Sequence, residues 1–504
     1  MASKSKSRLA ALPRSEICAY WVLSFGSHLY SFYELHRFSK EHEAGLEREF
    51  QLQKGLLGGF KKDPNDFEWS FWSNWAKKSL LCTLFGHAVV SKLSSILVPK
   101  LKVAVVSGYG LLVACGTLGI KGVAVIMVHL GLSLGVAQLC RPSMSWCCAL
   151  LLLSTLHIPP VQELKRSWYE TEEEYYLLLF SVAVCGLRFI SFSLEHCWHP
   201  LEAGGLVQIY WLTAYSFYHP LFYNGPIVTF KDFVEQMQRP AEKNGDKRTL
   251  LPLLAKAGRI VVWWLTAEYM IHFMYMHSIQ TNETYLEILP PWALGGLALA
   301  LVQFFYVKYL VLFGLPSLLA TLDNLVPPKL PRCVSIMYSF TGMWRHFDEG
   351  LYLWLIRYVY VPLGGSHHGP LWKVLSTGLA FGFVCLWHGG HDYLQYWALM
   401  NWAGVLVENG LRALLTSPFI LPSIERGLSP PMRRRCAAFL FAVSTAMLIL
   451  SNLVFLGGIH VGRIFWKRVI IQGWPTMVPS MLAFLYCFAQ IGLEWKNHCN
   501  TLSL

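Results

Sequence analysis

The sequence predicts an all-α polytopic membrane protein, and both its composition and the length of its apolar runs indicate this class. Of the 504 residues, 54% are hydrophobic and only 14% are charged, whereas a soluble domain carries roughly 25% charged residues. A helix needs about 20 mostly apolar residues to cross a bilayer, and runs of about that length recur along the chain. We therefore expect one membrane-embedded unit over residues 16–495, with no detachable soluble domain.

The apolar runs also predict where the chain crosses the membrane. Several of them are short or contain glycine, so some are expected to be re-entrant rather than spanning. We expect about ten to twelve true crossings. The candidate spans are 16–33, 76–97, 103–119, 122–140, 144–158, 175–196, 206–224, 257–278, 290–315, 374–388, 392–410, 436–458 and 475–492.

The distribution of charge predicts how this unit is oriented. The formal net charge is +12, which in a soluble chain would suggest nucleic acid, but loops that face the cytosol collect Lys and Arg. The basic segment 1–15 and the run Arg433–Arg435 are therefore expected in the cytosol, and the short tail 496–504 on the same side. Asn282 begins the only Asn-x-Ser/Thr sequon, which is useful if its loop is lumenal.

Two polar clusters interrupt the apolar pattern in the second half of the chain. Trp387-His388-Gly389-Gly390 follows an apolar run, and Trp344-Arg345-His346-Phe347-Asp348 lies upstream of it. An ionisable group at membrane depth is costly and usually faces a cavity where it has a function. The clusters therefore suggest a reaction chamber. The simpler interpretation of His388 is a histidine that caps a helix end with a structural hydrogen bond. A metal site in His388-Gly-Gly-His391-Asp392 is disfavoured, because the two glycines disturb the helical spacing of two ligands and no third ligand has a set spacing.

Most of the 13 cysteines lie singly in apolar runs, where they are expected to be small core residues with free thiols. Cys333 differs, because it follows a proline-rich break just ahead of the Asp348 cluster. Its thiol is therefore a candidate for lipidation or for binding a metal.

Three motifs together resemble the signature blocks of the membrane-bound O-acyltransferases. They are Trp344-Arg-x-Phe-Asp348, Arg357-Tyr-Val-Tyr-x-Pro-x-Gly-Gly365 and Trp387-His-Gly-Gly390. The segments 30–34, 66–72, 224–226, 339–344 and 451–458 also fit, so the resemblance covers nearly the whole chain. His346 and His391 stand where tyrosine is usual. One branch of the family has lost the active histidine, but this chain keeps His388.

The resemblance implies a fold in which the helices and re-entrant segments surround a central tunnel, with a catalytic core at about 290–460. It also implies transfer of palmitate from palmitoyl-CoA to the amine of the N-terminal cysteine of Hedgehog proteins. The expected compartment is the endoplasmic reticulum membrane, with the Golgi as a further one. The implied partners are the Hedgehog N-terminal cysteine, palmitoyl-CoA and membrane lipid, with no nucleic acid.

The same resemblance suggests roles for individual residues. His388 is expected to be the general base, and Asp348 to hold the incoming ammonium or to orient the reacting complex. Trp344 and Arg345 are assigned to the acyl-CoA side, Asn452 to the thioester oxygen and Glu68 to substrate binding. Cys333 matches a position at which a related enzyme binds haem through a thiolate.

Two other functions remain open from the sequence. A transporter or channel also places ionisable residues at membrane depth between broken helices, although it usually has related half-repeats and none is found here. A non-catalytic acyl-binding regulator would bind the same acyl group and form no product.

Overall fold

The computed structural model describes residues 10–55, 59–200, 204–239 and 246–502, and nearly all of the regular structure in them is helical. A short antiparallel hairpin of β1 (Gln53–Lys54) and β2 (Lys61–Lys62) is the sheet found in these ranges. The predicted basic segment 1–15 lies largely outside the described residues, as does the end of the tail 496–504. The all-α class is confirmed.

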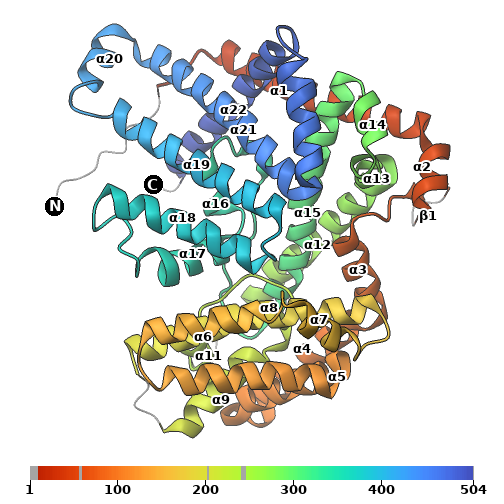
Figure 1. The fold of residues 1–504 in the computed structure, drawn as a ribbon, viewed down its shortest axis with the longest axis vertical. Helices are drawn as coiled ribbons and strands as arrows, with labels where there is room; N and C mark the ends of the chain where they lie inside the picture. Colours follow the sequence, from red (N-terminus) through yellow and green to blue (C-terminus); the bar gives the residue numbers. More distant parts are fainter. Residues whose placement is uncertain (1–9, 56–58, 201–203, 240–245, 503–504) are drawn as a thin grey trace.

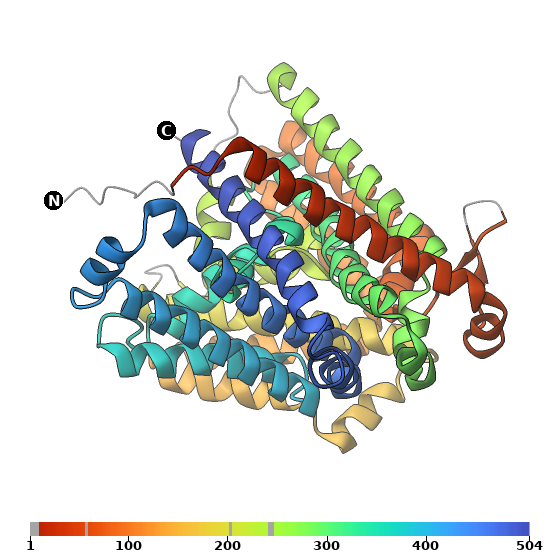
Figure 2. The same cartoon turned by 90° about the horizontal axis from the view of Figure 1, so that it is seen from above.

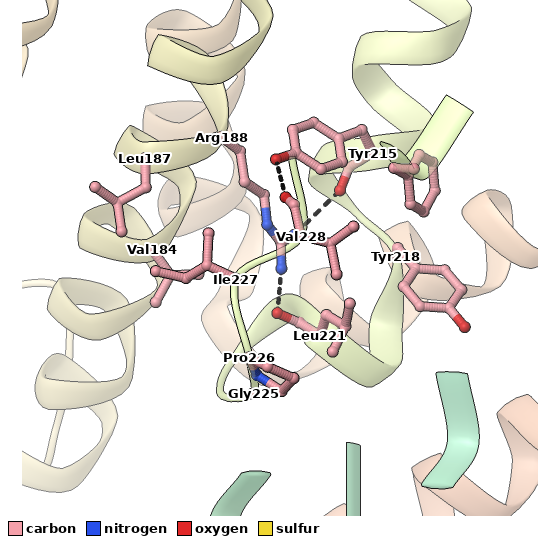
Figure 3. A pocket seen from close by; sticks show the side chains of 11 residues that line it. Val184, Leu187, Arg188, Tyr215, Tyr218, Leu221, Gly225, Pro226, Ile227 and Val228 are labelled. Carbon is pink, nitrogen blue, oxygen red and sulfur yellow. Dashed lines mark hydrogen bonds between the residues drawn. The ribbon is translucent and has the colours of Figure 1, made fainter. Parts of the chain in front are cut away.

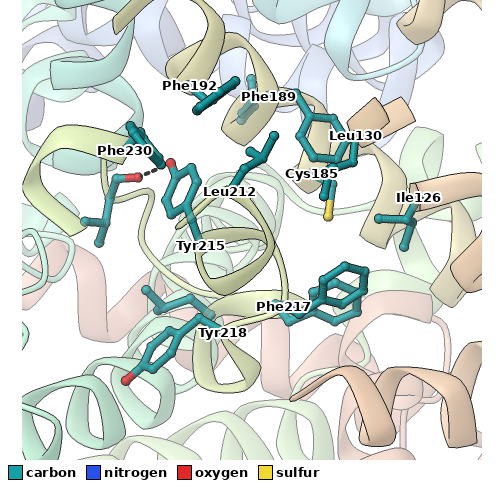
Figure 4. Close-up of a cluster of buried hydrophobic side chains, with 14 of the residues drawn as sticks. Ile126, Leu130, Cys185, Phe189, Phe192, Leu212, Tyr215, Phe217, Tyr218 and Phe230 are labelled. Atoms are coloured by element: carbon teal, nitrogen blue, oxygen red, sulfur yellow. Dashed lines mark hydrogen bonds between the residues drawn. The ribbon is translucent and has the colours of Figure 1, made fainter. Parts of the chain in front are cut away.

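The lower part of Figure 1 is built by the orange and yellow helices, which pack around α8 and α5. Figure 4 shows part of their core, in which Phe189 and Phe192 of α8 face Leu212 and Tyr215 of α9. We call this the lower core. Its elements are α3 (Phe67–Trp75), η1 (Ala76–Leu80), α4 (Leu81–Leu97), η2 (Pro99–Leu101), α5 (Lys102–Ala137), α6 (Pro142–Ser154), α7 (Pro159–Arg166), α8 (Glu172–Trp198), α9 (Gly205–Ser216), α10 (His219–Phe222) and α11 (Phe230–Met237).

The upper part contains the N-terminal, central and C-terminal helices, with α15 in contact with α1, α12 and α21. Seen from above, α1 lies across the molecule beside α22 (Figure 2). Buried side chains of the helices other than α22 form the upper core, and those of α22 form a separate cluster. The elements of the upper part are α1 (Arg14–Glu41), α2 (Glu43–Phe50), α12 (Asp246–Phe273), α13 (Met276–Thr281), α14 (Glu283–Ile288), α15 (Pro291–Leu322), α21 (Pro430–Phe465), η5 (Trp466–Ile471) and α22 (Met477–Leu502).

The segment between α15 and α21 carries both polar clusters, and it passes from one core to the other. Phe340, Met343 and Phe347 are buried in the upper core, whereas Trp354 and Tyr358 are buried in the lower core. The two cores therefore meet around Asp348. The elements of this segment are η3 (Val334–Ile336), α16 (Phe340–His346), α17 (Glu349–Leu355), η4 (Ile356–Tyr360), α18 (Pro370–Trp387), α19 (Asp392–Leu415) and α20 (Leu421–Gly427).

The expected ten to twelve crossings are not confirmed. Seven helices in the described ranges are long and apolar enough to span a membrane, or eight if the bent pair α6–α7 counts as one span. The expected spans 103–119 and 122–140 both fall within α5, in which two helical stretches meet at a kink at Gly119, where φ is +68°. The expected span 206–224 breaks into α9 and α10. With 12 residues, α9 is only about 18 Å long and cannot cross alone. The chain is a multi-pass membrane protein with fewer clear spans than predicted.

Candidate active site

Asp348 is the N-cap residue of α17, and its carboxylate accepts a hydrogen bond from the N–H of Leu351 at 2.9 Å. Aspartate is favoured at this position, because its side chain satisfies a backbone donor that the helix leaves free. The side chain is half-buried, and it lies between two candidate spans. Burial raises the pKa of Asp348 to about 6, against the lowering effect of the Leu351 and Gly350 N–H groups. Asp348 therefore combines a structural cap with a carboxylate that titrates close to neutral pH.

His388 ends α18, but its backbone rather than its imidazole makes the capping bond. The N–H of His388 donates to the carbonyl of Val384 at 3.0 Å. Gly389 and Gly390 follow with φ of +116° and +68°, which glycine adopts readily at a helix end. In the described part of the chain the imidazole makes no side-chain hydrogen bond, and it is open to space that a water molecule can enter. The structure therefore does not support the interpretation that the imidazole caps the helix.

Two aromatic side chains connect the His388 and Asp348 clusters. The ring of Phe455 in α21 lies 5.7 Å from the imidazole of His388 and 5.9 Å from the ring of Phe305, centroid to centroid. Phe305 stacks in turn on Phe347 at 5.2 Å, and Phe347 directly precedes Asp348. Three successive ring contacts therefore link the two clusters that the sequence singled out.

The half-buried side chain of Trp344 packs against other parts of the protein. Its indole N–H donates to the side-chain oxygen of Asn401 at 2.9 Å. Its ring packs edge-on against Trp397 at 5.2 Å and Phe381 at 5.8 Å. The side chain of Trp344 forms part of the apolar wall near His388.

Arg345 is exposed and belongs to a group of cations. His346 interacts electrostatically with Arg332, Arg345, Lys496 and Lys329, which come from separate segments of the chain. Burial and these four positive neighbours lower the pKa of His346. The group concentrates positive charge beside the Asp348 cluster, where an anionic group of a substrate would be favoured.

Asn452 lies on α21 one turn before Phe455, so the two side chains share a helix face. It is half-buried, and its amide makes no side-chain hydrogen bond to any residue that the structure describes. Asn452 is thus an available donor on the face of α21 that contacts His388.

A family model connects this geometry to known proteins. The model of the membrane-bound O-acyltransferase family matches residues 137–451, which include Asp348 and His388. The chain belongs to this family. Membership in an acyltransferase family argues against the transporter or channel hypothesis.

Individual relatives of this acyltransferase extend the similarity to both ends of the chain. It is 49% identical to the mouse protein-cysteine N-palmitoyltransferase HHAT, over 96% of this chain and 99% of that protein. It is 30% identical to the mouse protein-cysteine N-palmitoyltransferase HHAT-like protein, over 96% and 95% of the two chains. With the Drosophila melanogaster protein-cysteine N-palmitoyltransferase Rasp it shares 26% identity over 63% of this chain and 62% of that protein.

Glu68 belongs to a partly buried ionic cluster that the sequence pattern does not predict as a unit. Lys308 of α15 lies 2.9 Å from the carboxylate of Glu68 and 3.0 Å from that of Asp66. The hydroxyl of Tyr309 donates to Glu68 at 3.2 Å, and Tyr309 is close enough to Asp348 to interact with it electrostatically. A signal for Lys308 was present in the sequence, because a lysine inside the apolar run 290–315 must find an anionic partner.

Cys333 carries a free, half-buried thiol at the start of η3. A single thiolate is chemically suited to bind haem iron. Among the described residues, however, no group of three or more His, Cys, Asp or Glu side chains could hold a metal ion. The donor atom fits haem, but its surroundings add nothing further in favour of a haem site.

The largest cavity described lies apart from the polar clusters. It has a volume of about 380 Å³ between α1, α15, α21 and α22, and its wall is mainly apolar. Leu450 and Leu453 of α21 line it, whereas Phe455 on the same helix contacts His388. Because α21 separates this cavity from His388, the expected central tunnel at the active site stays a prediction.

Proposed function

We propose that this acyltransferase moves palmitate from palmitoyl-CoA to the N-terminal cysteine amine of Hedgehog signalling proteins in the endoplasmic reticulum membrane. The observation that carries the proposal is the free imidazole of His388, joined through Phe455 and Phe305 to the Asp348 cluster. The similarity over 99% of a protein named as a cysteine N-palmitoyltransferase supports the acyl group and the acceptor.

His388 is the proposed general base. The α-amine has an unperturbed pKa of about 7.7–8.0, so it must lose a proton before it can attack a thioester. The amine nitrogen forms a bond to the palmitoyl carbonyl carbon, the carbon–sulfur bond breaks, and CoA leaves as a thiolate. The ammonium first loses one proton to water, and His388 then accepts the second proton as the amide forms and passes it to that thiolate, so the step ends with an amide, free CoA thiol, neutral imidazole and one proton in solution.

Asp348 is proposed to hold the incoming N-terminus as an ammonium before it is deprotonated. With a pKa of about 6, the carboxylate is mostly ionised at pH 7. Its cap to Leu351 uses one of its oxygen atoms, which leaves acceptor capacity for the substrate.

The acyl-CoA side is proposed to lie at Trp344 and Arg345. The cations around His346 provide positive charge for the phosphate groups of CoA. The ring of Trp344 offers apolar surface to the acyl chain, and each buried CH₂ of that chain contributes about 0.8 kcal/mol.

Asn452 is proposed to donate to the thioester oxygen as negative charge develops on it. Loss of one such donor costs about 3–4 kcal/mol in other acyl-transfer enzymes. Glu68 is proposed to bind the peptide substrate, since the Asp66–Glu68–Lys308 cluster holds two carboxylates against one lysine. Haem ligation by Cys333 is a separate proposal, which rests on the motif match and the partly buried thiol.

The decisive experiment supplies purified protein with palmitoyl-CoA and a Hedgehog N-terminal peptide, and locates the added mass by tandem mass spectrometry. The product is expected to carry palmitate on the α-amine and to resist neutral hydroxylamine. A peptide acetylated on its α-amine is the matched control and should not be labelled. Labelling of that peptide would identify an S-acyltransferase, and binding of both substrates without product would identify a non-catalytic regulator.

A further inference from the structure

Arg188 of α8 is a buried cation whose described hydrogen bonds all end on backbone carbonyls. Its guanidinium donates to the carbonyls of Tyr215 at 3.1 Å and Ser216 at 2.6 Å, and also to the carbonyl of Leu221. The first two belong to the last turn of α9, where a helix leaves carbonyls without partners. Figure 3 shows the guanidinium between α9 and the segment that follows. Arg188 therefore holds together the break between α9 and α10.

The loop after α10 is fixed to the same place by Tyr215. The Tyr215 hydroxyl donates to the carbonyl of Val228 at 2.6 Å (Figure 3), and its ring packs under the Arg188 guanidinium at 5.7 Å. A cavity of about 20 Å³, room for roughly one water, lies beside these groups. The loop 224–228 thus rests on close-packed structure.

The loop touches the active site at Gly350, two residues after Asp348. A Cβ atom placed on Gly350 would lie 2.8 Å from both the backbone N and O of Ile227. The N–H groups of Gly350 and Leu351 are the ones that bind the Asp348 carboxylate. The backbone of the loop therefore forms the wall behind the turn that orients Asp348.

A second contact fastens α17 to the helix that carries Arg188. The indole N–H of Trp354 donates to the carbonyl of Leu187 at 3.2 Å, and Leu187 directly precedes Arg188. Both ends of α17 are thus set by α8, at one end through the loop and at the other directly.

From these contacts we infer that Arg188 is a positioning residue of the acyl transfer, which holds the loop 224–228 against Gly350 and so fixes the carboxylate of Asp348. The inference rests on the proposed function, because it needs Asp348 to act on the peptide amine. It assigns a catalytic purpose to a buried arginine far from both signature clusters in the sequence.

The test compares Arg188→Met and Arg188→Lys with wild type in the peptide acylation assay. Methionine removes every carbonyl contact, and lysine can reach fewer of the carbonyls than the forked guanidinium does. Misplacement of a catalytic group by about 1 Å costs up to a hundredfold in rate. We therefore expect kcat to fall at least about tenfold in Arg188→Met and less in Arg188→Lys, with acyl-CoA affinity unchanged.

The matched control is Lys165→Met. Lys165 is also a buried cation that donates to a backbone carbonyl after a helix end, that of Thr155 at 3.3 Å, but it does not touch the loop 224–228. Its replacement should leave kcat within about twofold of wild type, within the ordinary scatter of independent sites. An equal loss of kcat in Lys165→Met would show a general effect on folding and overturn the inference.

A double-mutant cycle with Asp348→Asn separates positioning from other roles. If Arg188 acts through Asp348, Arg188→Met should lower kcat by less than about threefold in a protein that already carries Asp348→Asn. If the reductions of kcat in the two single variants multiply in the double variant, Arg188 has only a structural role and the inference is wrong. Absence of amide product with the wild-type protein would instead refute the proposed function itself.

Two further variants keep the test decisive if Arg188→Met does not fold. Tyr215→Phe removes only the hydroxyl that holds Val228, and Gly350→Ala pushes Ile227 away directly. Both should lower kcat and shift the acidic limb of its pH profile, with acyl-CoA binding retained. An unchanged profile in both variants would contradict the inference.

Discussion

The imidazole of His388 meets the ring of Phe455 edge-on, with their centroids 5.7 Å apart and their planes at 84°. Residues 388 and 455 lie on different helices, and Phe455 also reaches Phe305 beside the Asp348 cluster. The proposed base is thus held by packing rather than by hydrogen bonds, so its ring nitrogens remain free for a substrate.

Replacing His388 by alanine should abolish amide formation while the protein still folds and binds acyl-CoA. The imidazole makes no side-chain hydrogen bond in the described residues, so its loss leaves no buried polar group without a partner. Turnover is measured by mass spectrometry, and folding by thermal unfolding with and without palmitoyl-CoA. Acylation near the wild-type rate would exclude His388 as the base.

Asp348→Asn should lower turnover by at least about a hundredfold, the range of a positioned acid–base group. Asparagine also serves as an N-cap, so α17 should persist. Acyl-CoA affinity should stay nearly intact, as measured by titration. A parallel loss of acyl-CoA binding would move Asp348 to the donor side of the site.

The raised pKa of Asp348 also predicts a pH dependence. Turnover should decline as the pH falls through about 6 and the carboxylate becomes protonated. The unfolded carboxyl has a pKa of about 3.9, so ionised Asp348 costs folded-state stability above pH 6, and this cost disappears between pH 6 and 4. The acidic limb of the rate profile should be missing in Asp348→Asn, and its persistence there would assign the limb to another group.

His346→Tyr should leave the rate profile between pH 7 and 8 unchanged. The pKa of His346 is lowered by burial and neighbouring cations, so the wild-type imidazole is neutral in that range. Tyrosine is neutral there too, so the substitution changes no charge. Below about pH 6.5 the unfolded chain takes up this proton more readily than the folded protein. The wild type should therefore lose stability there relative to the tyrosine variant, and equal pH dependence of unfolding would contradict this.

Lys308→Met should be strongly destabilising, by about 3–5 kcal/mol, because it leaves the Asp66 and Glu68 carboxylates buried without their cation. Lys467→Met is the matched control, since Lys467 pairs with Glu287 in a largely exposed ion pair. That variant should change stability by less than about 1 kcal/mol. Thermal unfolding in detergent compares the two.

If Cys333 ligates haem, the purified protein should show a Soret band that disappears in Cys333→Ala. An unchanged spectrum in the variant, or no band in a well-folded preparation, would rule out this ligand. Cys436→Ala is a suitable control, because Cys436 is an exposed free thiol on α21.

The sequence was most informative where the chemistry is local. The motif around His388 predicted a helix end, since consecutive glycines supply the positive φ angles that end α18. The sequence was least informative where the packing of distant helices determines which side chains meet. Nothing in the residues around position 455 indicates how α21 is rotated, so the role of Phe455 could not be foreseen. The expected count of ten to twelve spans is not confirmed, and within the expected span 206–224 α9 ends at a break that Arg188 stabilises from another helix.

The turn at Asp348 joins two separately packed halves of the protein, and this has a consequence for engineering. Substitutions that improve packing within the lower core or the upper core alone should raise thermal stability with little change in the rate of acyl transfer. They leave the contact between the two cores unaltered. Substitutions at the contact between the cores, at Ile227 or Gly350, should change both thermal stability and the rate of acyl transfer. A screen for heat-resistant variants that keep full activity should therefore recover substitutions far from the contact between the two cores. Frequent substitutions at that contact would show that its geometry does not affect the rate of acyl transfer.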